Sequence, residues 1–244
     1  MLRRTFLVAV AAVIGSLYAG PVNAQSLDEV LAKHYEAIGG LDAWQSIQSV
    51  KLSGTMVLMG GAMQAPITIL QKRPAKARVE FTVQGMQGVQ AYDGETAWIQ
   101  MPFMGSPDPE AAPEDMVQQM KEQADLDGPL IGWKEDGHTV ELVGKEDVEG
   151  TETFKLKVTL DTGEVSDYFL DAEYFLPIKV ESTRMVQGAE TMITTSLGDY
   201  KEVAGLIVPF SIEVNTAMGP QSISFDTIEV NVDMDDALFS MPEN

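Results

Sequence analysis

The sequence predicts a mainly β protein with a few helices, folded as one domain. Apolar residues alternate with a period of two over most of the chain after residue 49, which is typical of antiparallel strands with one face in water. Turn residues separate the alternating segments at short intervals, and about twelve such segments fit a sandwich or a barrel on pattern alone. No linker, repeat or low-complexity tract divides the chain, so we expect a single core.

The first 24 residues have the pattern of a secretory signal peptide. Arg3 and Arg4 precede an apolar run over 6–17, and Val22-Asn23-Ala24 supplies the small residues of a signal-peptidase site. We expect cleavage after Ala24 and export to the periplasm, which leaves residues 25–244 as the folded domain. An uncleaved membrane anchor is the alternative, but the run is shorter than the roughly 20 apolar residues that span a bilayer.

A capping box predicts an amphipathic helix at the start of this domain. Ser26 offers its hydroxyl to a free backbone N–H, and Glu29 follows three residues later. Apolar residues then recur at helical spacing up to Ile38, and Gly39-Gly40 is typical of a left-handed helix C-terminus. A short second turn or helix is expected over 41–47.

Two series of strands follow these helices. The first is expected over 50–59, 63–72, 75–84, 89–93 and 96–101. The second is expected over 139–143, 153–160, 163–170, 177–185, 191–197, 206–215 and 222–232. The alternation is clearest where Phe154 and Leu156 interleave with Lys155 and Lys157, which places one face in an apolar environment and one in water.

The segment between the two series breaks the pattern. Residues 106–113 are acidic and rich in proline, and they are not among the expected strands. Pro113 then begins a helix with acids in its first turn, and Asp127-Gly128-Pro129 ends it. The helix carries a narrow apolar stripe, which must lie on another apolar surface: Met116, Val117, Met120 and Ala124.

Composition excludes several partners. The net charge is −21, and without the leader 14 basic and 37 acidic residues remain, a net charge of −23. Such a surface repels phosphate backbones and anionic headgroups, so no nucleic-acid partner is expected. The charge favours solubility, although an acidic proteome of a saline habitat explains it equally well. With 0 Cys there is neither a disulfide nor a lipidated cysteine, and we expect a soluble protein held by its core.

No pattern in the chain indicates catalysis. His34 and His138 are the only histidines, and the motifs of zinc hydrolases, serine-nucleophile elbows and phosphate-binding loops are missing. Asp233, Asp235 and Asp236 lack the glycine and the distal glutamate of a calcium loop. We therefore expect no enzyme activity, no metal and no cofactor. A secreted enzyme of unknown type is the weakest hypothesis.

Five motifs occur along the chain in a characteristic order. They are Lys72-Arg73-Pro74, Asp93-Gly94-Glu95-Thr96-Ala97-Trp98, Asp199-Tyr200-Lys201, Val208-Pro209-Phe210 and Leu238-Phe239-Ser240-Met241-Pro242. In this order they resemble the motifs of LolA-type periplasmic carriers and the wider outer-membrane lipoprotein-sorting superfamily. The resemblance implies a single curved antiparallel sheet that forms an unclosed β-barrel. It also implies that the N-terminal helix and the inserted helix, the latter as a lid, lie on the concave side.

The resemblance further implies an apolar ligand cavity. Methionine suits such a cavity because its unbranched side chain repacks easily, although any single one of the 13 methionines after residue 24 can equally fill a core. The candidate lining residues are Met56, Leu58, Ile69, Val79, Phe81, Trp98, Met101, Met116, Met120, Phe154 and Leu156. In the superfamily the arginine that matches Arg73 is implicated in lid closure, so Arg73 is the candidate latch. An exposed charge at a strand end is the alternative.

The leading functional hypothesis is a monomeric carrier of lipoprotein acyl chains or of another lipid. It would receive its cargo from a releasing complex at the inner membrane and pass it to an acceptor at the outer membrane. The alternative is a periplasmic lipid-sensing or stress-response regulator of the same fold. Such regulators usually carry an additional C-terminal domain, and the present chain stops soon after its last predicted strand.

Overall fold

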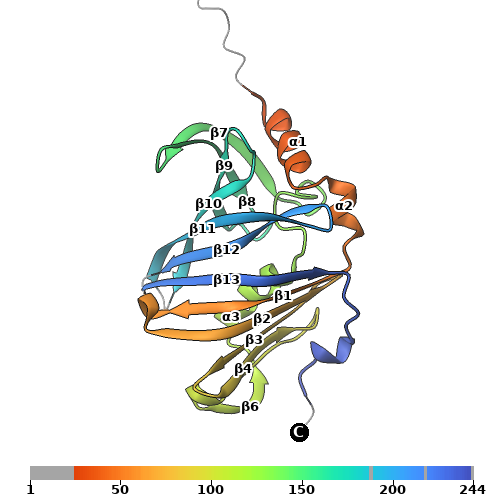
Figure 1. Cartoon of the computed structure of the whole chain (residues 1–244), viewed down its shortest axis with the longest axis vertical. Helices are drawn as coiled ribbons and strands as arrows, with labels where there is room; N and C mark the ends of the chain where they lie inside the picture. The colour runs from red at the N-terminus through yellow and green to blue at the C-terminus, as the bar shows by residue number, and fades with distance from the viewer. Residues whose placement is uncertain (1–24, 187–188, 217–218, 243–244) are drawn as a thin grey trace, which may run out of the picture.

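A single antiparallel sheet of 13 strands dominates the computed structural model, which describes residues 25–186, 189–216 and 219–242 (Figure 1). The strand order is β6-β5-β4-β3-β2-β1-β13-β12-β11-β10-β9-β8-β7, so β6 and β7 form its two edges. The sheet is curved and does not close, which confirms the predicted unclosed barrel. The predicted signal peptide, residues 1–24, lies outside the described residues. None of the helices in the described part is long and apolar enough to cross a membrane.

The elements follow the predicted order. The helices are α1 (Leu27–Ala37), α2 (Leu41–Ser46) and α3 (Glu114–Ala124), with short 3-10 turns η1 (Met59–Gly61), η2 (Pro102–Met104) and η3 (Asp236–Leu238). The strands before α3 are β1 (Ser49–Leu58), β2 (Met63–Lys72), β3 (Lys76–Val83), β4 (Met86–Tyr92), β5 (Ala97–Met101) and β6 (Ser106–Ala111). The strands after it are β7 (Thr139–Val148), β8 (Thr151–Thr159), β9 (Val165–Asp171), β10 (Pro177–Val186), β11 (Ala189–Val203), β12 (Leu206–Thr216) and β13 (Gly219–Val230).

Pairing of β1 with β13 joins the two halves of the sheet. Met56 lies opposite Ile223 in this pair, and the register shifts at Gly54. A Cβ at Gly54 would lie 2.1 Å from the carbonyl oxygen of Ser224, so only glycine allows the strands to approach this closely. The first and last strands thus meet at the centre of the sheet, and its two edge strands come from the middle of the chain.

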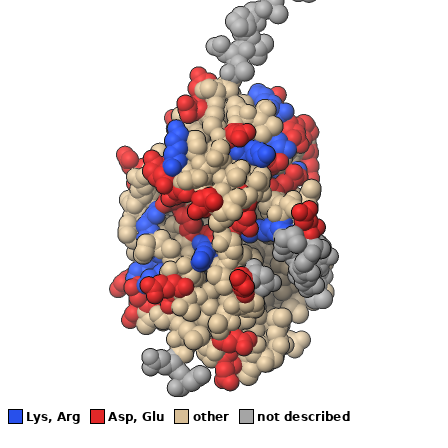
Figure 2. All heavy atoms as spheres, turned by 180° about the vertical axis from the view of Figure 1, so that it is seen from behind, with Lys and Arg blue, Asp and Glu red and all other residues tan. Residues whose placement is uncertain are grey.

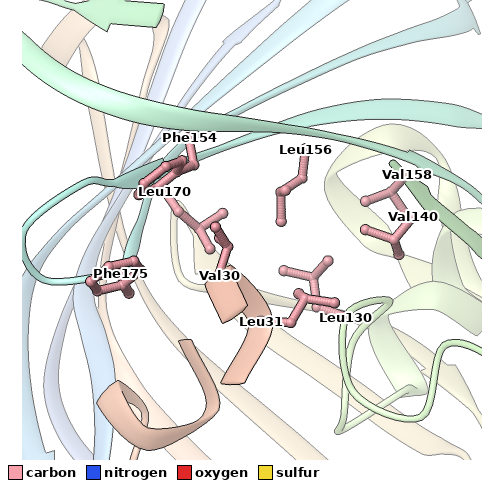
Figure 3. Packing of buried hydrophobic residues seen from close by; sticks show 9 residues of the cluster. All are labelled: Val30, Leu31, Leu130, Val140, Phe154, Leu156, Val158, Leu170 and Phe175. Atoms are coloured by element: carbon pink, nitrogen blue, oxygen red, sulfur yellow. The ribbon is translucent and has the colours of Figure 1, made fainter. Parts of the chain in front are cut away.

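Helix α1 covers the half of the sheet that contains β7, β8 and β9. Its capping box is present, as predicted, with Ser26 Oγ accepting from the N–H of Glu29. Val30 and Leu31 are buried against Phe154, Leu156 and other apolar side chains of this half. Figure 3 shows these side chains directed toward one another between the helix and the strands. The cluster is one solid part of the core.

Helix α3 crosses the other half on the same, concave side, and in the view of Figure 1 it lies behind β1 and β13. Its buried residues Met120 and Ala124 pack against Ala77 of β3, Tyr92 of β4 and Ala97 of β5. The predicted apolar stripe therefore lies on the sheet. The N-terminal and inserted helices occupy the concave side, as the resemblance implied.

Strand β6 is the main departure from the sequence-based prediction. The segment was not among the predicted strands because of its prolines, yet Trp98 pairs with Ala111 and Met101 with Ser106. Proline cannot donate a ladder hydrogen bond, and at an edge one side of the strand needs no partner. Pro107 and Pro109 are therefore tolerated in β6 because it ends the sheet.

Candidate apolar ligand surface

The strand register shows which predicted residues share the concave face. Ala77 faces α3, and Val79 and Phe81 follow it at intervals of two along β3, so they lie on the same side. Ile69 of β2 lies opposite Val79. Met56 and Leu58 of β1 belong to the same face, because Leu52, four and six residues before them, lies opposite Ile69.

These residues form the centre of the candidate surface. Met56, Leu58, Ile69, Val79 and Phe81 are all half-buried, so each keeps apolar area that the protein itself does not cover. Five sequence-predicted positions from three neighbouring strands are thus brought together. We refer to them as the concave apolar surface.

The three predicted methionines near α3 lie at its border. Met101 of β5 is buried and shares the concave face with Ala97. Met120 is buried between α3 and the sheet, and Met116, one helical turn before it, is half-buried. Met116 and Met120 therefore attach α3 to the sheet, and Met101 lies on the same face of β5 as Ala97.

Phe154 and Leu156 lie elsewhere on the concave side. They are 2% and 0% exposed, and the side chains of α1 fill the space above them (Figure 3). In this structure they belong to the core cluster under α1 and present no open surface. The alternation along β8 correctly placed them on an apolar face, but it carried no information on what covers that face.

Trp98 lies on the opposite, convex face. Ala97, the residue before it, faces the concave side, so the side chain of Trp98 points to the other side of the sheet. Its indole Nε1 donates to the carbonyl oxygen of Phe239, at 2.8 Å. The segment after β13 runs across this face, so Trp98 is 1% exposed and packs with Val89 and Ala91. Its predicted position in the cavity does not agree with this placement, because both faces of β5 are covered and its sequence does not reveal which side a residue faces.

The second half of the sheet adds apolar residues that the prediction missed. Ile223 of β13 lies opposite Met56, and Ile212 of β12 lies opposite Ile223. Both are half-buried and extend the concave apolar surface across the junction of the two halves. The alternation Val208-Phe210-Ile212-Val214 in β12 was the signal that could have identified them.

Two surface hollows lie outside this region. One of about 420 Å³ is bordered by Ser49, Lys72 and Asn231, and one of about 480 Å³ lies at the turn containing Gly150 and Glu173. Most of the residues that border them have polar or charged side chains, and both hollows lie at strand ends. The concave apolar surface is thus a better candidate for an apolar ligand than either hollow.

Two acidic side chains in the segment after β13 make contacts within the protein. Asp236 pairs with Lys72 at 2.7 Å and with Lys76 at 2.8 Å, and hydrogen bonds from these two lysines lower its pKa to about 2. Asp235 caps η3 by accepting from the N–H of Ala237. In the parts of the chain that the structure describes, no group of three or more His, Cys, Asp or Glu side chains is arranged to hold a metal ion.

Arg73 links the end of β2 to the segment that follows α3. Its Nη1 and Nη2 atoms donate to the two carboxylate oxygens of Asp127, each at 2.6 Å, and this contact raises the pKa of Arg73. Its Nε donates to the carbonyl oxygen of Ile47 at 2.7 Å, and Nη2 also reaches that of Trp44 at 3.3 Å. A guanidinium makes this bidentate contact, whereas a lysine ammonium does not. The candidate latch therefore contacts the segment directly after α3.

A second arginine holds α3 from the other half of the sheet. Arg184 of β10 donates to the carboxylate of Glu122 at 2.5 and 3.3 Å. Burial alone would raise the pKa of Glu122, but the hydrogen bonds from Arg184 and the nearby positive charge lower it. Sequence reasoning missed this pair, because 62 residues separate its partners and neither belongs to a motif.

Glu164, directly before β9, brings a second carboxyl to the same place. Its hydrogen bond with Glu122 and its burial raise the pKa of Glu164. Its Oε2 atom is buried without a hydrogen-bond partner among the described residues. Next to this cluster, burial raises the pKa of Tyr168 to about 12. Two carboxyl groups thus lie near one arginine beneath α3, and their charges repel each other when both are ionised.

Replacing Glu164 with glutamine is expected to stabilise the protein at pH 7. A carboxyl with a raised pKa in the folded state favours folding below its ordinary pKa of 4.5, and this contribution is lost as the pH rises through the folded-state value. Glutamine removes the charge and keeps the shape. The midpoint of urea unfolding should therefore be higher for Glu164→Gln than for the parent at pH 7, and equal below pH 4.5.

Glu110→Gln, on the exposed part of β6, is the matched control and should leave the unfolding midpoint unchanged at both pH values. A stability difference for Glu164→Gln that is the same at pH 4 and pH 7 would show that titration of this carboxyl is not its cause.

Comparisons with solved structures place this geometry among known folds. A LolA superfamily protein from Nitrosomonas europaea superposes with a TM-score of 0.58 at 16% identity, over 89% of this chain and 98% of that chain. A DUF1329 family protein from Desulfovibrio piger gives 0.63 at 12% identity, over 89% and 98%. A domain assigned to outer membrane lipoprotein sorting from Vibrio parahaemolyticus gives 0.57 at 12% identity, over 86% and 94%.

No protein-family model matches the sequence, and no curated protein matches it. The identities to the solved structures are low, and the similarity is one of architecture: a curved, unclosed antiparallel sheet with helices on its concave side. This chain has a LolA-like fold.

Proposed function

We propose that the protein is a periplasmic carrier that binds the acyl chains of lipoproteins, or another lipid, and shuttles them toward the outer membrane. The ligand would lie on the concave apolar surface, beneath or beside α3. The protein would act by binding and release, without chemical conversion of the ligand.

The observation that carries this proposal is the concave apolar surface itself. Met56, Ile69 and Phe81 are half-buried on a face that the helices cover only in part. Burial of an acyl chain contributes about 0.8 kcal/mol per methylene, or on the order of 10 kcal/mol for a long chain. The methionine side chains adapt to chains of different length because they are unbranched and flexible. A surface of this kind therefore suits lipids better than polar metabolites.

The contacts of α3 support a role for this helix as a lid. Arg73 and Arg184 hold the lid segment at Asp127 and Glu122, from opposite halves of the sheet. Both contacts are ionic and only partly exposed, and they can break without loss of the apolar core under α1. We propose that release of Arg73 from Asp127 opens the concave side for entry and exit of the ligand.

The energy of acyl-chain burial also bears on partners. Removal of a lipid from a bilayer exposes a comparable apolar area, so unassisted extraction would be slow. We therefore propose that an inner-membrane releasing complex loads the protein and that an outer-membrane acceptor unloads it. The LolA-like fold and the lipoprotein-sorting relative from Vibrio parahaemolyticus are consistent with this sequence of steps.

Titration with a fluorescent fatty acid tests the binding step. The protein should bind a single-chain fluorescent fatty acid saturably in vesicle-free buffer. Met56→Glu should weaken binding about tenfold or more, because a charge on the concave face must lose water when the chain binds. Val57→Glu is the matched control: it adds the same charge one residue away in β1, on the opposite face of the sheet.

The two variants separate the outcomes. Weak binding by Met56→Glu with normal binding by Val57→Glu supports the concave surface as the site. Absence of saturable binding by the unmodified protein, or equal loss in both variants, would contradict the proposal. Circular dichroism and unfolding midpoints of both variants show whether either substitution acts through stability instead.

A further inference from the structure

Three turns at one end of the first half of the sheet contain no charged residue. In an antiparallel meander the β1–β2, β3–β4 and β5–β6 turns lie at the same end, and Figure 1 shows them at the left and lower left. They comprise residues 59–63, 83–87 and 101–106, none of which is Asp, Glu, Lys or Arg. We call these three turns the uncharged rim.

The rim differs from the rest of the molecule. Charged residues make up 22% of the chain, so 16 average positions would carry between three and four of them. At the opposite end of the same strands, the β2–β3 and β4–β5 turns contain Arg73, Asp93 and Glu95. In Figure 2 acidic side chains lie over the upper part, along the left edge and at the bottom centre of the face, whereas the lower right part is largely uncharged.

Phe103 anchors the β5–β6 turn of the rim and leaves methionine side chains exposed beside it. Phe103 packs edge-to-face on Phe81, with ring centroids 5.6 Å apart. Gly88 leaves room for this contact, since a Cβ there would lie 2.8 Å from Phe103 and 2.9 Å from Phe81. This anchor leaves the next residue, Met104, 73% exposed, and Met86 on the adjacent turn is 38% exposed.

The rim is continuous with the concave apolar surface. Leu58 pairs with Met63 at the end of the β1–β2 hairpin, and Leu58 belongs to the concave face. Met86 pairs with Val83, which shares that face with Phe81. Apolar side chains therefore run without interruption from the exposed turns to the candidate ligand surface.

We propose that the uncharged rim docks on the surface of a lipid bilayer without net charge, so that a lipid chain passes between the bilayer and the concave surface without crossing water. This inference rests on the proposed carrier function. Methionine and phenylalanine enter the headgroup region without stripping water from a charge. The rim offers few polar side chains that could specify a protein partner. The net charge of −21 keeps the remaining surface away from anionic lipid.

Vesicle flotation tests the docking. The full mature chain should float with phosphatidylcholine vesicles and float less when one third of the lipid is phosphatidylglycerol. The double variant Met86→Glu/Met104→Glu should reduce flotation about tenfold or more, because two exposed apolar chains are replaced by charges. The control Val143→Glu/Tyr174→Glu adds the same charge at apolar positions that are 58% and 63% exposed, away from the rim, and should float normally.

Fatty-acid binding in vesicle-free buffer separates this inference from the carrier proposal. Loss of flotation with normal fatty-acid binding in the rim variant supports docking through the rim. Failure of the unmodified protein to float, or equal flotation of rim and control variants, overturns it. Flotation through the rim by a protein that binds no fatty acid would leave the docking in place and reject the carrier function.

Discussion

Replacing Arg73 with leucine is expected to lower the free energy of unfolding by about 2–4 kcal/mol and to loosen the segment that contains α3. The substitution removes two hydrogen bonds to Asp127 and those to the carbonyl oxygens of Ile47 and Trp44. Hydrogen bonds to charged groups contribute about 1.5–3 kcal/mol each when buried, and partial exposure of both side chains, 23% each, reduces this. The loss exceeds that of a surface ion pair, because Asp127 remains without its cation.

Hydrogen exchange checks where the effect occurs. Amides of residues 114–128 should exchange faster in Arg73→Leu, while those of β8 under α1 should keep their rates. Release of the fluorescent fatty acid should also become faster. Arg73→Lys should recover only part of the stability, because an ammonium does not make the bidentate contact. A double-mutant cycle with Asp127→Asn measures the coupling of the pair directly.

Arg78→Leu is the matched control for the latch. Arg78 lies on β3, the strand that follows the turn containing Arg73. It contacts Glu80 and the carbonyl oxygen of Leu238 on the convex face. Its loss should reduce stability without faster exchange in α3 or faster ligand release. If Arg73→Leu loosens α3 no more than Arg78→Leu does, the latch role is wrong and the contact is purely structural.

A change from Leu156 to alanine should destabilise the protein by about 3–5 kcal/mol, the largest effect expected for a single truncation. Leu156 is 0% exposed in the cluster beneath α1, and large-to-small substitutions in such clusters lose both transfer free energy and packing around the resulting cavity. The cluster packs a helix on a sheet, so neighbouring side chains close the cavity only partly. Urea unfolding at pH 7 measures the change.

Ligand binding distinguishes core from ligand site at this position. Leu156→Ala should bind the fluorescent fatty acid with unchanged affinity under conditions where it is folded, because Leu156 is fully buried in the cluster that α1 covers. Val143→Ala, on the exposed side of the neighbouring strand β7, should change stability by less than about 0.5 kcal/mol. A strong loss of binding with little loss of stability for Leu156→Ala would mean that the ligand occupies the space under α1.

Much of the fold was predictable because its signals are local. Each signal involves residues that are close together in the sequence. Examples are the capping box at Ser26, the period of two in β2 and β8, and the proline at the start of α3. Strand β2 has the predicted bounds, 63–72. Strand β6 was missed because its prolines are acceptable only at an edge, and edge position is a property of the whole sheet.

The candidate site was predictable only in part. The resemblance suggested Met56, Ile69, Val79 and Phe81 as lining residues, and the ladder brings them together. The resemblance did not separate them from Leu156, which was suggested in the same way but lies under α1. Periodicity reports that a face is apolar and carries no information on what covers it.

The chain by itself determined its elements, their order and the division of most strands into an apolar and a polar face, because hydrogen-bonding geometry and side-chain alternation are properties of neighbouring residues. Only the tertiary structure decided which apolar faces the protein fills with its own helices, as at Leu156, and which it leaves half-covered, as at Met56. It also brought Arg73 to Asp127 and Arg184 to Glu122. The coverage of each face and these two ion pairs depend on packing between segments far apart in the chain. Long-range contacts, rather than local preference, determine the free energy of folding there.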